Sequence, residues 1–176
     1  MHSSDSAAAE KGQSKTLTFR VDDIPVDDTL ALIHNLEKIF DRDDSLRESA
    51  ATLDCHSLVL KDKDHSCAIV SIKTLLSPGD LDTLLLKAGT GYPYDYSCVF
   101  NGITPLYACP SSANVDIIAV PGLGSHPIAS WKSPTRNNVW LRDFLPKDLP
   151  NIRVLLYGYD TKLPGSLSKQ SIEDLL

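Results

Sequence analysis

Residues 115–127 read Val115-Asp116-Ile117-Ile118-Ala119-Val120-Pro121-Gly122-Leu123-Gly124-Ser125-His126-Pro127. The first six of these residues, rich in Val and Ile, are typical of a buried strand. The Pro-Gly-x-Gly that follows predicts a turn in which the backbone comes close to another group. The C-terminal end of such a strand is where α/β sheets bind ligands. We therefore expect a strand at residues 115–120 and a candidate binding loop directly after it.

A second apolar run completes a strand–helix–strand unit. Residues 140–145, with Trp140, Leu141 and Phe144, predict a short helix that stops at Pro-Lys-Asp-Leu-Pro. We expect Trp131 and Trp140 to be buried anchors and not stacking groups for a substrate. Residues 153–158, Arg-Val-Leu-Leu-Tyr-Gly, predict a strand. A strand, a glycine loop, a helix and a strand within about 45 residues fit a right-handed crossover in a parallel sheet.

These residues resemble the start of lipase-like α/β-hydrolases. In that family a strand ends in His-Gly-Leu-Gly-Gly-His-Pro, and Trp-Leu-Arg-Asp-Phe-Leu-Pro precedes a strand that ends in Tyr-Gly-Tyr-Asp. The matching residues here are 122–127, Trp131, 140–146 and 157–160. The chain is similar to the serine-active-site-containing lipase-like proteins and to the hydrolase domains of many fungal NACHT and ankyrin-repeat receptors, over residues 104–176. The resemblance implies an intracellular serine hydrolase of the cytoplasm, from a family whose members also occur at mitochondria and the endoplasmic reticulum.

The resemblance also implies an oxyanion loop, whose candidate residues are Gly122, Leu123, Gly124, Ser125 and His126. Backbone N–H groups of Leu123 and Gly124 take the donor role, and we expect His126 to position the loop. The family's His before Gly-Leu-Gly is Pro121 here, which removes one N–H donor.

No catalytic nucleophile, acid or histidine is identifiable in the sequence. The family's nucleophile elbow, Gly-x-Ser-x-Gly, lies beyond the next helix and strand, whereas this sequence stops at Leu176, inside that expected helix. Residues 165–168, Gly-Ser-Leu-Ser, lack the closing glycine and follow no strand. We expect them to form a polar loop before a capped helix at residues 171–176.

The preceding residues predict a βαββαβ order. The expected elements are strands at 17–24, 52–60, 66–74 and 97–100, with helices that begin near Asp27 or Asp28 and near Ser77 and a charged loop at 41–48. This is the split βαβ or ferredoxin-like order, which is similar to an RNA-recognition motif. However, Arg20, Cys67 and Ile69 fall where such modules carry base-stacking aromatics.

Charge also disfavours nucleic acid as a partner. Residues 1–110 hold ten Lys and Arg against 17 Asp and Glu, whereas residues 111–176 hold seven against six. An acidic module repels the phosphate backbone. RNA binding is therefore the weakest of the functions we weigh.

The predicted fold class is α/β: an α+β ferredoxin-like module followed by an incomplete parallel sheet of the α/β-hydrolase type. The predicted domains are a disordered N-terminus at residues 1–15, the module at 16–108, a linker at 109–114, and a truncated hydrolase portion at 115–176. The four cysteines, Cys55, Cys67, Cys98 and Cys109, lack metal-ligand spacing, so we expect reduced thiols and neither metal nor cofactor. No run is long and apolar enough to span a membrane.

Two functions stay open. The first is the N-terminal fragment of a lipase- or esterase-like protein, catalytically incomplete as given. The second is a non-catalytic interaction module of a fungal immune-type receptor, which binds other protein domains or self-associates through its incomplete sheet. Because apolar residues such as Ile118 and Val120 would lack covering helices, we expect the part after Cys109 to be less stable than the module before it.

Overall fold

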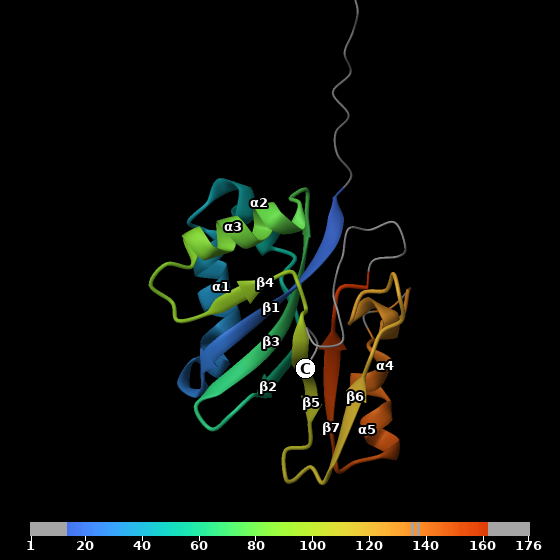
Figure 1. Ribbon diagram of the computed structural model, residues 1–176. Coiled ribbons are helices and arrows are strands. Elements are labelled where there is room, and N and C mark those ends of the chain that lie inside the picture. Colours follow the sequence, from blue (N-terminus) through green and yellow to red (C-terminus); the bar gives the residue numbers. More distant parts are fainter. Residues whose placement is uncertain (1–13, 135, 137, 162–176) are drawn as a thin grey trace, which may run out of the picture.

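The computed structural model describes residues 14–134, 136 and 138–161. The expectations for residues 1–13, for Ser166 and for the helix at residues 171–176 lie outside the described residues. Within them the chain has a mixed α and β fold with two sheets (Figure 1). The element order is β1 (Lys15–Pro25), η1 (Val26–Ala31), α1 (Leu32–Phe40), α2 (Asp44–Ala50), β2 (Asp54–Leu60), β3 (His65–Thr74), α3 (Pro78–Ala88), β4 (Asp95–Ser97), β5 (Gly102–Ala108), β6 (Val115–Ala119), η2 (Ala129–Trp131), α4 (Trp140–Asp143), α5 (Leu145–Asp148) and β7 (Ile152–Gly158).

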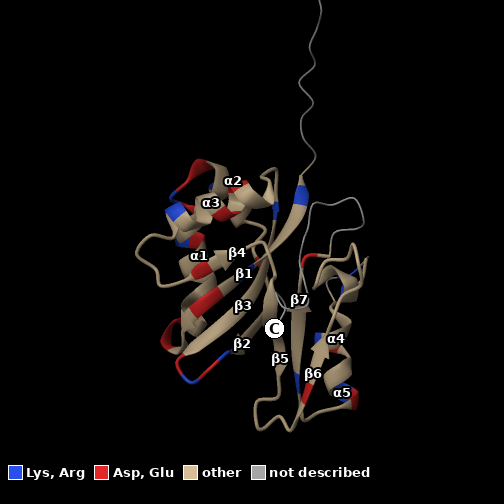
Figure 2. Ribbon diagram, in the orientation of Figure 1, with Lys and Arg blue, Asp and Glu red and all other residues tan. Residues whose placement is uncertain are grey.

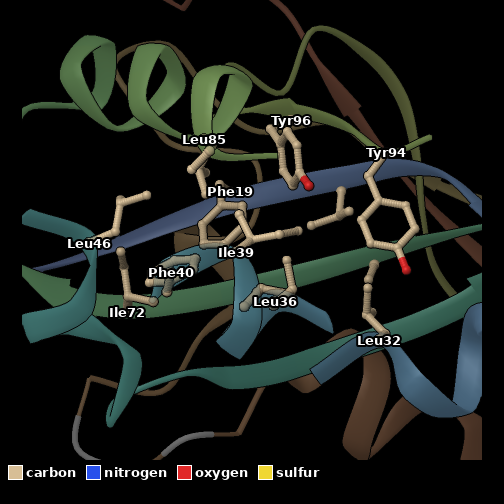
Figure 3. Close-up of a cluster of buried hydrophobic side chains, with 14 of the residues drawn as sticks. Phe19, Leu32, Leu36, Ile39, Phe40, Leu46, Ile72, Leu85, Tyr94 and Tyr96 are labelled. Atoms are coloured by element: carbon tan, nitrogen blue, oxygen red, sulfur yellow. The ribbon is translucent and has the colours of Figure 1, made fainter. Parts of the chain in front are cut away.

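The first sheet has four strands in the order β2-β3-β1-β4, and every neighbouring pair is antiparallel. Helices α1, α2 and α3 lie over one of its faces (Figure 1). Between helices and sheet lies a cluster of buried apolar side chains, in which the rings of Phe19 and Phe40 stack 6.5 Å apart (Figure 3). This cluster is the hydrophobic core of the first sheet.

Local sequence signals explain where two of the helices begin. Helix α3 starts after Ser77, whose hydroxyl accepts the Asp80 N–H, and it ends at Gly89 as expected. Helix α2 was not predicted, since residues 41–48 were expected to be a charged loop. The Asp43 side chain accepts the Ser45 N–H, and Leu46 is buried in the core, so a cap and one apolar anchor suffice for this short helix.

The second sheet has the order β5-β7-β6. Strand β6 runs parallel to β7, as the strand–helix–strand pattern predicted, and β5 runs antiparallel to β7. An antiparallel strand at the edge of a parallel pair is common in α/β sheets. The connection between β6 and β7 contains α4 and α5, so the single expected helix at residues 140–145 is replaced by two short ones, broken around Phe144.

Strand β5 was not predicted. Residues 102–108 had been assigned to the N-terminal module, but they pair with β7 in the second sheet. The fourth strand of the first sheet was expected at residues 97–100, and the structure instead has β4 at Asp95–Ser97. The strand pattern of β5 is hard to recognise in the sequence because the register is irregular beside Pro105. In addition, β7, with which β5 pairs, lies some 50 residues away along the chain.

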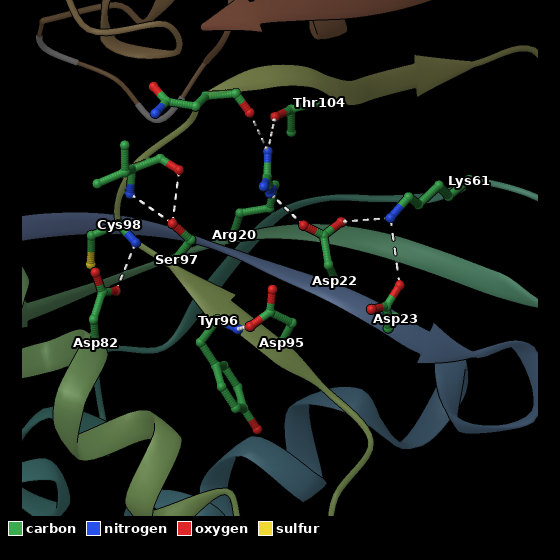
Figure 4. Close-up of polar contacts among 12 residues, drawn as sticks. Arg20, Asp22, Asp23, Lys61, Asp82, Asp95, Tyr96, Ser97, Cys98 and Thr104 are labelled. Atoms are coloured by element: carbon green, nitrogen blue, oxygen red, sulfur yellow. Dashed lines mark hydrogen bonds and ion pairs between the residues drawn. The ribbon is translucent and has the colours of Figure 1, made fainter. Parts of the chain in front are cut away.

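The two sheets pack against each other through the face of the first sheet that no helix covers. Ile69 of β3 joins a second apolar cluster with Phe100, Leu106, Val154 and Leu156, so β3 is buried on both faces. The Arg20 guanidinium donates to the Thr104 hydroxyl at 2.9 Å and to the Asn101 carbonyl at 3.3 Å (Figure 4). Only one face of the second sheet gains cover in this way.

Gly158 marks the closest approach between a strand and the segment that enters the second sheet. A Cβ atom placed on Gly158 would lie 1.4 Å from the Phe100 carbonyl oxygen, which is backbone and cannot rotate away. We predict that Gly158→Ala lowers the free energy of unfolding by about 3 kcal/mol, because β7 and this segment must separate. Urea denaturation of the variant and the parent chain measures the difference.

Gly79 provides the matched control, since a Cβ atom there has nothing within 4 Å and the residue lies in the first turn of α3. Gly79→Ala should leave stability unchanged or raise it by up to about 1 kcal/mol. Equal unfolding midpoints for the two alanine variants would contradict the close packing at Gly158.

Candidate functional site

The glycine loop, residues 121–127, follows β6 at its C-terminal end and lies beside the residues that follow β7. Gly124 N–H donates to the Thr161 carbonyl at 2.6 Å, and the Thr161 hydroxyl donates to the Ser125 carbonyl at 3.0 Å. The Tyr159 hydroxyl donates to the Pro121 carbonyl at 2.9 Å. These three hydrogen bonds between the residues that follow β6 and those that follow β7 fix the loop at the edge where parallel sheets bind ligands.

The structure leaves one of the two expected oxyanion donors available. The Gly124 N–H is already bonded, whereas the Leu123 N–H has no hydrogen-bond partner within the described residues. Gly124 has φ 69°, a conformation that favours glycine, and Leu123 at the tip of the loop is 66% exposed. Of the two expected donors, the loop can therefore offer the Leu123 N–H to an anion, whereas the Gly124 N–H becomes available only if its Thr161 contact opens.

His126 holds the loop in place. Its Nδ1 accepts the N–H groups of Ile128 at 3.2 Å and Ala129 at 3.4 Å, so the proton of the neutral ring resides on Nε2. The ring lies edge-on to Phe100 with centroids 5.1 Å apart. Burial lowers the pKa of His126, since a charged imidazolium would lose its hydration. These contacts support the loop-positioning role that we expected.

Ser125 has no base beside it. Its backbone N–H donates to the Gly122 carbonyl at 3.2 Å, but its hydroxyl makes no hydrogen bond within the described residues. The Nδ1 of the neighbouring His126 is occupied by backbone donors. The loop therefore lacks the serine–histidine hydrogen bond that activates a nucleophile.

A serine–histidine pair that the sequence did not reveal lies on the first sheet. His56 Nε2 is 2.7 Å from the Ser71 hydroxyl, and His56 Nδ1 is 3.9 Å from an Asp54 carboxylate oxygen. The register irregularity between Cys55 and Ser57 turns His56 toward Ser71 across the β2–β3 pair. No local pattern signals such a bulge, so only the pairing of the strands brings these side chains together.

This pair is buried and does not form a reactive centre. His56 and Ser71 are each 4% exposed, so a substrate cannot reach the hydroxyl. Burial, followed by the nearby Lys132, lowers the pKa of His56, and in the described part of the chain its Nδ1 has no hydrogen-bond partner. A neutral histidine bonded to serine here links β2 to β3, while the His56 carbonyl accepts a hydrogen bond from the Arg142 guanidinium of α4.

Two of the cavities lie close to the glycine loop or α4. One, of about 270 Å³, is lined by residues of β1 together with Pro78, Cys98, His126 and Ala129. Another, of about 420 Å³, is lined by Trp131, Trp140 and Phe144 among polar residues. Trp140 is 51% exposed, which corrects the expectation that it is a buried anchor.

The cysteines are free thiols with different surroundings. Burial raises the pKa of Cys55 and Cys67, and it raises that of Cys98 to about 12. The hydrogen bond from Ser111 lowers the pKa of the Cys109 thiol. Among the described residues no three His, Cys, Asp or Glu side chains gather in a way that could hold a metal ion.

The comparisons with known proteins give no relative for this chain. It matches no protein-family model, and no curated protein or solved structure matches it. In the described part of the chain no helix is both long and apolar enough to cross a membrane. The geometry of the chain itself therefore carries the functional argument.

The two buried histidines make stability sensitive to mild acid. Both pKa values are lowered in the folded chain, so below the unfolded pKa of about 6.5 the unfolded chain binds more protons than the native one. Protonated His56 would also face Lys132 and Arg142 beside Asp54 and Asp143. We predict that the urea midpoint falls as pH drops from 7.5 to 5.5, as measured by circular dichroism.

Replacing His56 tests whether its buried imidazole contributes to the loss of stability in acid. His56→Gln should reduce the fall between the two pH values, because it removes one group that titrates differently in the two states. His34→Gln, on the exposed surface of α1, should leave the fall unchanged. A parent chain with the same midpoint at both pH values would refute this reading of His56 and His126.

Proposed function

We propose that this chain supplies the first strands and the oxyanion-type loop of a lipase-like α/β-hydrolase sheet, and that it is catalytically inactive by itself. The observation that carries the proposal is the position of the glycine loop. It projects from the C-terminal end of β6 next to its parallel neighbour β7, with Leu123 exposed and its N–H unbonded within the described residues. In α/β-hydrolases a loop of this kind faces the nucleophile.

The proposed inactivity follows from three observations around the loop. Pro121 offers no N–H, the Gly124 N–H is bonded to Thr161, and within the described residues the Ser125 hydroxyl has no base. A loop without an activated nucleophile cannot carry out acyl transfer. The missing groups would have to come from further polypeptide at the same edge of the sheet.

For the first part of the chain we propose a ferredoxin-like module that does not bind nucleic acid. Its support is the βαββαβ order together with the strand order β2-β3-β1-β4. The face that stacks bases in RNA-recognition motifs is covered here: Cys67 and Ile69 are buried, and Arg20 bonds to Asn101 and Thr104 of the second part. Acidic side chains are spread over the helices and the β2–β3 turn (Figure 2).

Protein interaction is the second candidate function, and it has its own observation. Ile118 and Val120 of the second sheet are each more than half exposed, as is Ile103 on β5. Adjacent exposed apolar side chains of this kind mark surfaces that bind protein. Other protein domains or a second copy are the partners that this surface would take, and the free cysteines support a reducing intracellular compartment.

We predict that the chain hydrolyses short acyl esters no faster than buffer. The assay follows p-nitrophenyl butyrate hydrolysis by the parent chain, Ser125→Ala and Ser71→Ala, with a fluorophosphonate probe to detect an activated serine. All three proteins should give the buffer rate and no labelling, because one serine lacks a base and the other is buried. Turnover or labelling that disappears in either alanine variant would overturn the proposed inactivity.

A further inference from the structure

One face of the second sheet carries a six-residue apolar surface, which we call the outer patch. The strand register places Pro105, Leu155 and Ile118 in one row across the sheet and pairs Ile103 with Tyr157 in the next. Val120, the residue directly after β6, continues the alternation from Ile118. Tyr157 is half-buried and Leu155 is buried, while Ile103, Ile118 and Val120 are 54–55% exposed. The patch therefore extends across all three strands of the sheet.

A charged row borders the outer patch on one side. Arg153 of β7 and Asp116 of β6 are register partners, and their guanidinium and carboxylate bond at 2.9 and 2.6 Å. Both side chains are partly exposed. This ion pair gives the surface an apolar centre with a polar rim, which is the composition of a docking surface.

The opposite face of the same sheet is already filled. Ala119, Ile152, Val154 and Leu156 pack there with Ile69 of the first sheet and Leu141 of α4. The connection from β6 to β7 through α4 therefore occupies that face. Parallel strands are ordinarily covered on both faces, so the outer patch is the face that lacks its layer.

The right-handedness of connections between parallel strands indicates which segment covers the outer patch. One edge of β7 is paired with β5 and the other with β6, whereas the outer edge of β6 pairs with no strand in the described part of the chain. Chain that continues from β7 into a further parallel strand can therefore join this sheet only beyond β6. A right-handed connection in that direction, opposite to the step from β6 to β7, passes over the opposite face, which is the outer patch.

Residues 162–176, outside the described part, continue from Thr161 at this end of the sheet. Ile172, Leu175 and Leu176 recur at the spacing of one helix face. The nine residues 162–170 can span about 30 Å when extended, which is ample to reach over β7 and β6. The segment thus has both the reach and the apolar residues that the patch requires.

We propose that the outer patch is the docking site of residues 162–176 of the same chain, with Ile172 and its apolar neighbours seated on Ile118 and Leu155. The docked segment covers β6 and β7 and directs the chain toward the free edge of β6. The proposal deepens the proposed function and rests on it for one point only, that β6 and β7 belong to an α/β sheet.

Trypsin tests the docking in the full chain, because Lys162 and Lys169 lie within the segment. Ile118→Glu should raise the rate of cleavage after Lys169 by about tenfold, as a lost docking contact would. Leu30→Glu is the matched control, since Leu30 is fully exposed on η1, away from the second sheet, and should leave the rate unchanged. Mass spectrometry follows the release of residues 170–176 over time.

A substitution on the other side of the proposed contact tests whether Ile172 and Ile118 interact directly. Ile172→Glu should raise the same cleavage rate, and the double variant with Ile118→Glu should add little, since both remove one interaction. Far-UV circular dichroism checks that each variant is folded. If Ile118→Glu unfolds, Val120→Gln at the end of β6 takes its place, with a smaller increase expected.

Three outcomes would overturn the proposal. The first is a parent chain that is cleaved as fast as Ile118→Glu, which means that the patch stays open. The second is full additivity in the double variant, which means that the two residues do not touch. The third is a dimer in sedimentation that Ile118→Glu dissociates, which means that a second copy covers the patch. Esterase turnover with normal protection would refute only the inactivity, so the two failures can be distinguished.

Discussion

The packing of Ile69 against Phe100, Leu106 and Val154 joins the two sheets into one structure. Because β3 is buried on both faces, removing the second sheet would expose Ile69 and Cys67, and removing the first sheet would expose Val154 and Leu156. Each fully buried aliphatic side chain contributes about 1.5–3 kcal/mol, which is large beside the net stability of a domain. Arg20 also fixes the relative orientation of the two sheets, because its guanidinium donates hydrogen bonds to Thr104 and Asn101 across the junction.

This junction changes the expected difference in stability between the two parts. From sequence, the part after Cys109 was expected to lack cover on its apolar strands. The structure shows that only one face of the second sheet lacks cover. On the inner face, Ile117, Val154 and Leu156 are covered by the first sheet and α4. On the other face, Ile118 and Val120 remain exposed. The shortfall in burial is therefore confined to the outer patch, and the first sheet supplies the layer that helices supply in other α/β folds.

The two histidines His56 and His126 have structural roles and not catalytic ones. His126 accepts two backbone N–H groups and thereby shapes the turn after the glycine loop, and His56 ties β2 to β3 through Ser71. In both cases burial lowers the histidine pKa, so the ring stays neutral. A neutral ring is also what general-base catalysis needs, but neither ring has an accessible partner to deprotonate.

The sequence alone determined the features that depend on local spacing. The Val/Ile run before Pro-Gly-x-Gly predicted β6 and its loop, the apolar spacing after residue 31 predicted α1, and Ser77 with Gly89 bounded α3. These signals are local because capping, glycine conformation and helical periodicity involve residues a few positions apart. Four features depend on contacts between distant segments: β5 pairs with β7, Ile69 faces the second sheet, His56 bonds to Ser71 and Trp140 is exposed. Alternation fixes which residues share a face of a strand, but the partner that covers this face is set by contacts between residues distant in sequence.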